Sequence, residues 1–324
     1  MDVVLQDVDC TDLRPLAPTS LECAFGVGDQ AENTIELVMP DTAPAMEAGQ
    51  VVYVEGTEYG GMLTRLSTKS GTVWDGLSWG GLLAAKVIVP DGGTGTLTVS
   101  GDANDVLRSL VKRAGLTDLF AVSPGKSALK ALQSYTFAAY ADYLAGIDAM
   151  LASVGGKLRM RHDGHQMVLS ALPLKDWSVD EEFDASQVEV SVDIDHVPTN
   201  HLVARGKDSK DNRVSVDLYM DESGNVSETQ SLKGRFEVAK YYDYTNADRD
   251  KLVEDGTKRL KGYWDKSRSV SLKLSADRDR YDVGDRIGGT DPASGVSATA
   301  TIVKKVVTLD SRGVSGVTYE TGSR

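Results

Sequence analysis

The stretch from Tyr281 to Thr321 constrains the fold most, because it reads as strands separated by tight turns. Gly284-Asp285 and the run from Asp291 to Gly295 carry turn residues, since glycine permits positive φ and proline fixes φ at about −65°. Val, Ile and Thr fill the intervening positions, and β-branched residues favour strands. A second turn at 310–313 leads into a last strand. The stretch shows no reactive centre and predicts consecutive strands of a β-sheet.

Most of the remaining chain also reads as β-structure. Residues 1 to about 100 contain short apolar or alternating runs, such as 35–39 and 51–54, separated by glycine-rich turns. Such regular short strands are typical of sandwiches and barrels. The pattern returns after 186, where apolar residues alternate with polar ones through Ile194. A helix starting at Thr245 or Asn246 interrupts it.

The region between these β segments has a different pattern. Asp102 or Asn104 caps a predicted helix that stops at Gly115. A longer helix is predicted over 135–154 from apolar residues at three- and four-residue steps. Residues 157–172 then predict a hairpin around Asp163-Gly164, with a type I′ turn.

The sequence therefore predicts an α+β, mainly β fold: two β-barrel-like domains with an α/β insert. The expected boundaries are 1–100 for the first barrel-like domain, 101–185 for the insert and 186–324 for the second barrel-like domain with its helix. The early strands after 186 either return to the first barrel or build the second. A weak resemblance between the strand pair at 49–66 and the one at 284–306 leaves a duplication as likely as not.

Composition narrows the function. The net charge of −13, from 48 acidic and 35 basic residues, argues against wrapping DNA or RNA, because phosphate binding depends on Lys and Arg. No apolar run is long enough to span a membrane, and the N-terminus resembles no signal peptide. Cys10 and Cys23 do not form a metal-type pair, and we interpret them as buried or half-buried thiols.

Several patterns resemble enzyme or metal motifs without completing them. Pro124-Gly125-Lys126-Ser127 resembles the end of a phosphate-binding loop, but Phe120 stands where the leading glycine belongs, which favours an ordinary loop before a helix. His162 and His165 flank a turn but lack further ligands, so exposed histidines are the better interpretation. His196 and His201 offer no stronger case.

A group of carboxylates precedes the C-terminal strands. Asp277, Asp279, Asp282 and Asp285 alternate with arginines at 278, 280 and 286, and the calcium-loop pattern fails for want of its glycine and final glutamate. We interpret the group as a salt-bridged strand edge or subunit contact. No nucleophile motif is present, and no cofactor, metal or catalytic residue is predicted.

Three segments together resemble a known family. They are the C-terminal stretch from Tyr281 through Leu309 with Val317 to Gly322, the segments Thr72-Val73-Trp74 and Trp79 to Pro90, and the helix-then-hairpin unit from Leu144 to Leu172. In this order they resemble siphophage tail-hub proteins, the N-terminal structural regions of tail-associated lysins, which are related in fold to the baseplate hubs of contractile tails. The segments Thr72-Val73-Trp74 and Trp79 to Pro90 are together similar to that family's first-domain strand pair. The signature residues are Trp74, Trp79, Pro90, Tyr281, Gly284, Asp285 and Gly295.

The resemblance implies a structural hub at the virion tail tip of a siphophage or prophage. It implies a homotrimer whose two barrel-like domains per subunit give a ring of six modules. The implied partners are a distal tail protein, the tape-measure protein, and tail-fibre or receptor-binding proteins. DNA would pass through the ring without being bound. Many relatives continue into a lysin region, whereas this sequence stops at Arg324, so no enzymatic activity is expected of it. Either the hydrolase lies in another protein, or the sequence is a truncated form or a prophage gene product.

Two other functions stay open at this point. A β-rich glycan-binding or glycan-hydrolysing module is the alternative, and it requires a pocket where carboxylates and aromatic residues converge. Aromatic residues make up only 6% of the chain, which ranks this alternative second. A secreted adhesin ranks third, because no signal peptide is recognised.

Overall fold

The computed structural model describes residues 2–28, 32–40, 45–69, 71–93, 95–179, 188–207, 213–274 and 279–322. The chain forms two compact units. The first consists of Met1–Glu189, Leu272–Gly289 and Ser297–Arg324, and the second of Val190–Ser271 and Thr290–Val296. Strands predominate in the described residues, as the α+β, mainly β prediction requires. No described helix has both the length and the apolar character needed to cross a membrane.

A ten-stranded sheet dominates the first unit. Its order is β19-β20-β3-β4-β7-β6-β5-β1-β2, with β21 also paired to β20. The strands are β1 (Val3–Gln6), β2 (Asp12–Leu16), β3 (Ser20–Gly26), β4 (Thr34–Met39), β5 (Val51–Val54), β6 (Gly60–Ser67), β7 (Thr72–Ser78), β19 (Arg286–Thr290), β20 (Ser297–Asp310) and β21 (Gly313–Gly322). No pairing among the described residues closes this sheet into a barrel.

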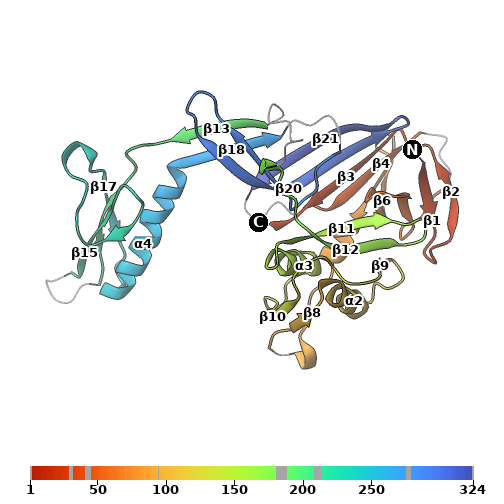
Figure 1. Cartoon of the computed structure of the whole chain (residues 1–324), viewed down its shortest axis with the longest axis horizontal. Helices are drawn as coiled ribbons and strands as arrows, with labels where there is room; N and C mark the ends of the chain where they lie inside the picture. Colours follow the sequence, from red (N-terminus) through yellow and green to blue (C-terminus); the bar gives the residue numbers. More distant parts are fainter. Residues whose placement is uncertain are drawn as a thin grey trace. The chain divides into compact units, whose positions relative to one another are not determined.

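The two ends of the chain share this sheet. β20 runs antiparallel to β3, with Val307 opposite Cys23 and Leu309 opposite Leu21 (Figure 1). These apolar side chains are buried in one core with the interior face of the N-terminal strands. The C-terminal strands were expected in the 186–324 domain. The structure differs, because β20 pairs with β3 in the sheet of the first unit and its apolar residues enter the core of that sheet.

The insert begins with a helix where a strand was expected. α1 (Trp79–Ala84) occupies the start of the segment interpreted as a strand pair ending at Pro90, and beyond it only Val87 forms an isolated bridge, to Asp142. Gly80 and Gly81 permit the helix to lie close to Asn33, because a Cβ at Gly81 would be 2.2 Å from the Asn33 carbonyl oxygen. The strand prediction for this segment is wrong.

The other helices of the insert are α2 (Ala103–Ala114) and α3 (Tyr143–Ala152). Asp102 caps α2 by accepting from the Asn104 N–H, and Gly115 ends it with φ of 68°, as predicted. The helix predicted over 135–154 starts eight residues late. Tyr135 lies in a strand, and Tyr140 has φ of 56°, which a continuous right-handed helix does not allow.

The strands of the insert are β8 (Thr98–Gly101), β9 (Phe120–Val122), β10 (Leu132–Thr136), β11 (Gly156–His162) and β12 (Met167–Pro173). β11 and β12 form the predicted hairpin, and β9 pairs in parallel with β12. The predicted type I′ turn is wrong. The loop has four residues, 163–166, and only Gly164 has positive φ, because the Asp163 carboxylate accepts from the N–H groups of His165 and Gln166.

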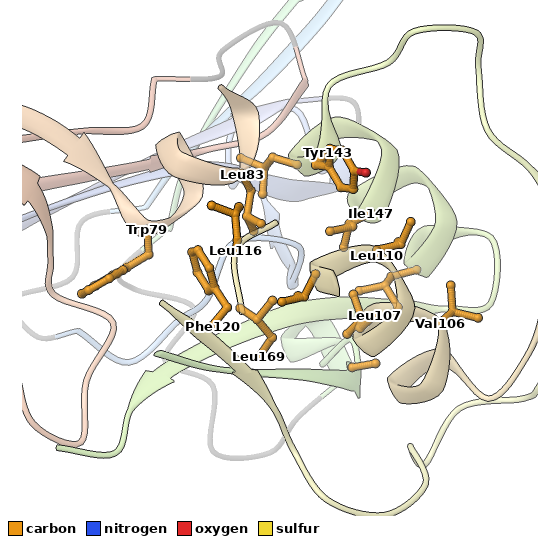
Figure 2. Close-up of a cluster of buried hydrophobic side chains, with 14 of the residues drawn as sticks. Trp79, Leu83, Val106, Leu107, Leu110, Leu116, Phe120, Tyr143, Ile147 and Leu169 are labelled. Atoms are coloured by element: carbon orange, nitrogen blue, oxygen red, sulfur yellow. The ribbon is translucent and has the colours of Figure 1, made fainter. Parts of the chain in front are cut away.

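The insert shares its core with the sheet. Leu107 and Leu110 of α2, Ile147 of α3 and Phe120 of β9 pack with Trp79 and Leu83 of α1 (Figure 2). The same cluster includes Val51 and Tyr53 of β5. The insert is therefore part of the first compact unit. Short 3₁₀ turns occur at Asp91–Gly93, Trp177–Val179 and Gly234–Phe236.

The second unit is a small sheet covered by one helix. Its strands follow the order β16-β15-β14-β17, and α4 packs against β14 and β15. The elements are β14 (His201–Arg205), β15 (Ser215–Met220), β16 (Val226–Ser227), β17 (Ala239–Asp243) and α4 (Arg249–Lys266). A two-stranded sheet joins β13 (Val188–Ile194) and β18 (Arg268–Leu274). Asp248 caps α4, whereas the sequence predicted a start at Thr245 or Asn246.

Candidate functional site: a buried junction of lysines and carboxylates

The turn before β19 is hydrogen-bonded to β20. Gly284 has φ of 94°, a conformation that glycine adopts without strain. Its N–H donates to the Ile302 carbonyl at 2.8 Å, and the Ile302 N–H donates to the Asp285 carbonyl at 2.9 Å. These two bonds place the Asp285 side chain inside the first unit, where only 1% of its surface is exposed.

The Asp285 carboxylate accepts hydrogen bonds from several parts of the chain. Oδ1 accepts from Lys157 Nζ of β11 and from the Lys175 N–H, at 2.7 and 2.8 Å. Oδ2 accepts from the indole Nε1–H of Trp177 at 3.1 Å. The three donors come from β11, from the backbone at Lys175 and from the Trp177 side chain. Asp285 therefore connects the C-terminal stretch to the insert.

Lys157 also contacts Asp282, one turn away from Asp285. Its Nζ lies 2.7 Å from Asp282 Oδ2. Burial on its own would raise the pKa of Asp282, but the ammonium groups of Lys157 and Lys305 lower it below its usual value. The lysine from β11 thus bridges two carboxylates of the C-terminal turn.

Lys305 of β20 is the second buried cation of the junction. Its Nζ contacts the carboxylates of Glu58, Asp279 and Asp282, the last two at 3.0 and 3.8 Å. Burial would lower the pKa of Lys305, yet these carboxylates raise it above the usual value. Burial raises the pKa of Glu58 above its usual value. The Lys305 ammonium opposes this shift, and the negative charges of Asp282 and Asp279 add to it.

Two tyrosines complete the hydrogen bonding of Asp279. The hydroxyls of Tyr59 and Tyr319 both donate to its carboxylate. Burial and the Asp279 charge raise the pKa of Tyr319 to about 12. The Tyr319 hydroxyl also accepts from the backbone N–H groups of Arg280 and Tyr281, so it fixes the start of the turn.

The junction combines residues from sequence-distant strands into one polar network. We use the name "ionic junction" for Glu58, Lys157, Asp279, Asp282, Asp285 and Lys305. Each of its carboxylates contacts a lysine. The junction therefore contains no pair of free carboxylates that could act on a substrate. The chemistry that this arrangement supports is attachment of the insert and the C-terminal turn to the sheet.

The structure brings three of the seven signature residues together. Gly284 and Asp285 form the turn, and the fully buried ring of Tyr281 packs edge-on against Trp177 at 5.0 Å. Trp74 is buried in the sheet core on β7, whereas Trp79 is buried in the core of the insert. Pro90 is buried after α1.

Gly295 is the signature residue that is not part of either core. It has φ of 69° in an exposed turn and falls in the second unit. The turn prediction at this position is confirmed by its positive φ.

The interpretation of the C-terminal acids as a strand edge is wrong. Asp279, Asp282 and Asp285 contact the buried ammonium groups of Lys157 and Lys305, and of these acids only Asp282 is half-exposed. Asp277 and Arg278 lie outside the described residues.

Glu58, Lys157 and Lys305 were missed from the sequence. One signal was available: the consecutive Lys304 and Lys305 lie within an apolar strand, and side chains alternate between faces. One of the two lysines must therefore point inward and needs an acid.

The histidines differ from their sequence interpretation at one position. His165 is exposed as expected, but His162 is 1% exposed and stacks on Tyr53 at 3.7 Å. Burial lowers the pKa of His162 to about 4. His201 of the second unit lies between the carboxylates of Glu237 and Asp217. Within the described ranges, no group of three His, Cys, Asp or Glu residues is placed to hold a metal ion.

The loop at Pro124 to Ser127 does not lead into a helix. The Ser127 N–H and hydroxyl both donate to the Asp102 carboxylate, and the next element is β10. These hydrogen bonds attach the loop to Asp102, the residue that caps the N-terminus of α2. The expectation of a following helix is wrong. Cys10 and Cys23 are free thiols, half-buried and buried respectively, as expected.

No protein-family model matches the chain, and no curated protein matches its sequence. Among solved structures, the chain is similar to prophage tail protein gp18 from Listeria monocytogenes EGD-e, at 13% identity and a TM-score of 0.48, over 100% of this chain and 95% of that one. It is similar to the 43 kDa tail protein of prophage MuSo2 from Shewanella oneidensis, at 11% identity and a TM-score of 0.46, over 100% of this chain and 98% of that one. It is also similar to a tail protein from Neisseria meningitidis MC58, at 13% identity and a TM-score of 0.44, over 99% of this chain and 96% of that one. All three of these solved structures are described as tail proteins.

Proposed function

We propose that the chain is a structural hub protein at the tail tip of a siphophage or prophage, where three copies form a ring that extends or closes the tail tube. The ionic junction is the observation that carries this proposal. It fastens the signature turn at Gly284 to β11 and to the β5–β6 turn through Lys157 and Lys305. A fully satisfied polar network holds segments distant in sequence in one fixed arrangement, which suits a structural subunit.

The two barrel-like domains belong to the same proposal. Their counterparts are the ten-stranded sheet of the first unit and the four-stranded sheet of the second. In the proposed trimer these give six modules around a central hole. Neighbouring copies, a distal tail protein, the tape-measure protein and fibre or receptor-binding proteins would contact the remaining surfaces.

An acidic row on the sheet fits passage of DNA without binding. Glu22 of β3 pairs directly with Glu36 of β4, and Glu36 pairs with Asp75 of β7. Glu22 and Glu36 are exposed. We place this face toward the hole, where negative charge repels phosphates in transit.

A glycan hydrolase is less well supported by the acids of the first unit. Glu58, Asp279 and Asp282 line a cleft of about 200 Å³, but Lys305 contacts all three. A larger cleft of about 700 Å³, lined by 128–135, 153–155 and Pro173, contains no carboxylate. A paired-acid mechanism needs two carboxylates facing the sugar, so we propose a role without catalysis.

Light scattering of the purified chain together with negative-stain electron microscopy tests the proposal. The trimer has an expected mass of about 104 kDa, three times 34.7 kDa, and a ring with a central hole. A monomer at high concentration that also fails to form rings with a distal tail protein would overturn it. A ring whose hole is lined by basic residues would remove the proposed orientation of the acidic row.

A further inference from the structure

β11 carries three basic residues on one side of the strand. Lys157, Arg159 and Arg161 occupy alternate positions, and alternate side chains of a strand share a face. Lys157 contacts Asp282 and Asp285 in the ionic junction. Arg159 and Arg161 are exposed, and the structure shows neither an ion pair nor a hydrogen bond from their side chains to any described residue.

The two arginines lie between adjoining clefts of about 200 and 370 Å³. Both clefts are lined by Arg159, Arg161 and Gly56 of the β5–β6 turn. This turn is fixed beside β11, because the Gly56 N–H donates to the His162 carbonyl and the His162 N–H donates to the Thr57 carbonyl, both at 2.8 Å. The arginines therefore belong to a groove with a defined opposite wall.

Gly56 sets how closely that wall approaches Arg161. Its φ is +74°, and a Cβ at this position would lie 3.4 Å from Nη2 and 3.8 Å from Nε of Arg161. The Arg161 guanidinium group therefore lies beside the backbone of Gly56, where no side chain intervenes. A larger residue at 56 would be strained and would crowd the guanidinium group.

We propose that Arg159 and Arg161 bind an extended acidic peptide segment of a neighbouring protein, with carboxylates on alternate residues. Two residues of strand span about 6.6–6.8 Å, so alternate carboxylates on an extended partner match the spacing of the two arginines. Guanidinium groups bind carboxylates bidentately. Lys157 already shows, within the chain, that this side of β11 takes carboxylates.

The surroundings favour a peptide over a nucleic acid. Glu55 and Asp163 line one cleft, and Glu58, Asp279 and Asp282 line the other. A continuous run of phosphates along the groove would meet these carboxylates, whereas two carboxylates at the right spacing meet only the arginines.

This inference rests on the proposed hub function only in assigning the acidic segment to a neighbouring tail protein. Peptide binding is measured on the free chain, so its failure leaves the ring test unaffected, and failure of the ring test leaves peptide binding unaffected.

The test uses fluorescence anisotropy at low salt with a nine-residue fluorescein-labelled peptide of Gly and Ser that carries acids at positions 4 and 6. A second peptide of equal composition carries them at positions 4 and 7, which places the two acids on opposite sides of an extended chain. We expect the first peptide to bind about fivefold tighter than the second. Equal binding of the two peptides would overturn the proposed spacing.

Variants identify the arginines as the site. We expect Arg159→Ala/Arg161→Ala to weaken binding of the first peptide about tenfold, and Arg159→Lys/Arg161→Lys to weaken it less, since charge remains but the bidentate geometry is lost. Arg108→Ala/Arg312→Ala removes the same charge from exposed pairs with Asp105 and Asp310 and should leave binding unchanged. Unchanged binding by the first variant, or tighter binding of an oligothymidylate than of the peptide, would overturn the proposal.

Discussion

Lys157 and Asp285 are separated by 128 residues in the sequence, yet Nζ of the lysine lies 2.7 Å from Oδ1 of the aspartate in the interior of the first unit. Their side chains are 7% and 2% exposed. The pair joins the insert hairpin to the turn that precedes β19. Because this pair is buried and joins segments far apart in sequence, we expect the β11–β12 hairpin and the turn before β19 both to be less stable when the charge of Asp285 is removed.

Replacing Asp285 with alanine should reduce the free energy of unfolding by about 1–3 kcal/mol, because the buried Lys157 keeps only its pair with Asp282. The Trp177 indole N–H and the Lys175 N–H also lose their acceptor. Urea unfolding at pH 7 measures the change. Asp310→Ala is the matched control, since it removes an aspartate that pairs with the exposed Arg312, and it should cost much less. Equal losses in the two variants would contradict a buried pair.

Gly284→Val should lower stability by about 1–2 kcal/mol or more, because a side chain at φ of 94° is strained. The added branch also disturbs the turn that carries Asp285. Gly316→Val on β21 is the control: nothing lies within 4 Å of a Cβ there, and its φ is not positive. Thermal unfolding of both variants checks the difference. A Gly284→Val protein as stable as Gly316→Val would show that the turn is not required.

His162 should make stability depend on pH in the acid range. Its pKa is about 4 in the folded chain against 6.5 for an ordinary histidine, so the unfolded chain takes up the proton first. The stability that this group contributes is fully present above pH 6.5 and is lost as the pH falls from 6.5 toward 4, by at most about 3 kcal/mol.

Urea unfolding at pH 7 and pH 5 measures this loss. His162→Phe keeps a ring beside Tyr53 and should show a smaller decline than the parent chain. His165→Phe changes an exposed histidine and should keep the decline. Identical pH profiles for the parent chain and His162→Phe would refute the assignment.

Glu36→Gln should raise the stability of the free subunit by about 0.2–1 kcal/mol, because Glu22 and Glu36 are directly opposed like charges on neighbouring strands. The gain should shrink in high salt, which screens exposed charges. Chemical unfolding at two salt concentrations checks both expectations. Lower stability of the variant at low salt would mean that another group compensates for the acidic pair.

The sequence predicted elements where local rules act alone. Asp102 and Gly115 delimit α2 as their capping preferences indicate, and the alternation at 188–194 forms β13. It failed where tertiary contacts decide. The apolar pattern at 82–90 fits a strand, but Gly81 allows a helix to approach Asn33 closely.

The candidate site was only half visible in the sequence. The turn chemistry of Gly284 and Asp285 pointed to the right segment, and the aspartates were noticed as a group. Their lysine partners come from β11 and β20, and no spacing rule links residues so far apart. Charge alternation with nearby arginines therefore suggested an exposed edge, although the preferred partners were buried lysines.

The pairing of β3 with β20 has a consequence for synthesis on the ribosome. Glu22 and its neighbour Thr308 lie 286 positions apart. At roughly 5–20 residues per second, β3 emerges about 15–60 s before the strand that covers its edge. During that interval the nascent chain presents an uncovered strand with a half-built core. Chaperone binding to the nascent N-terminal region, followed by release once residue 310 has emerged, is the folding route that this topology favours.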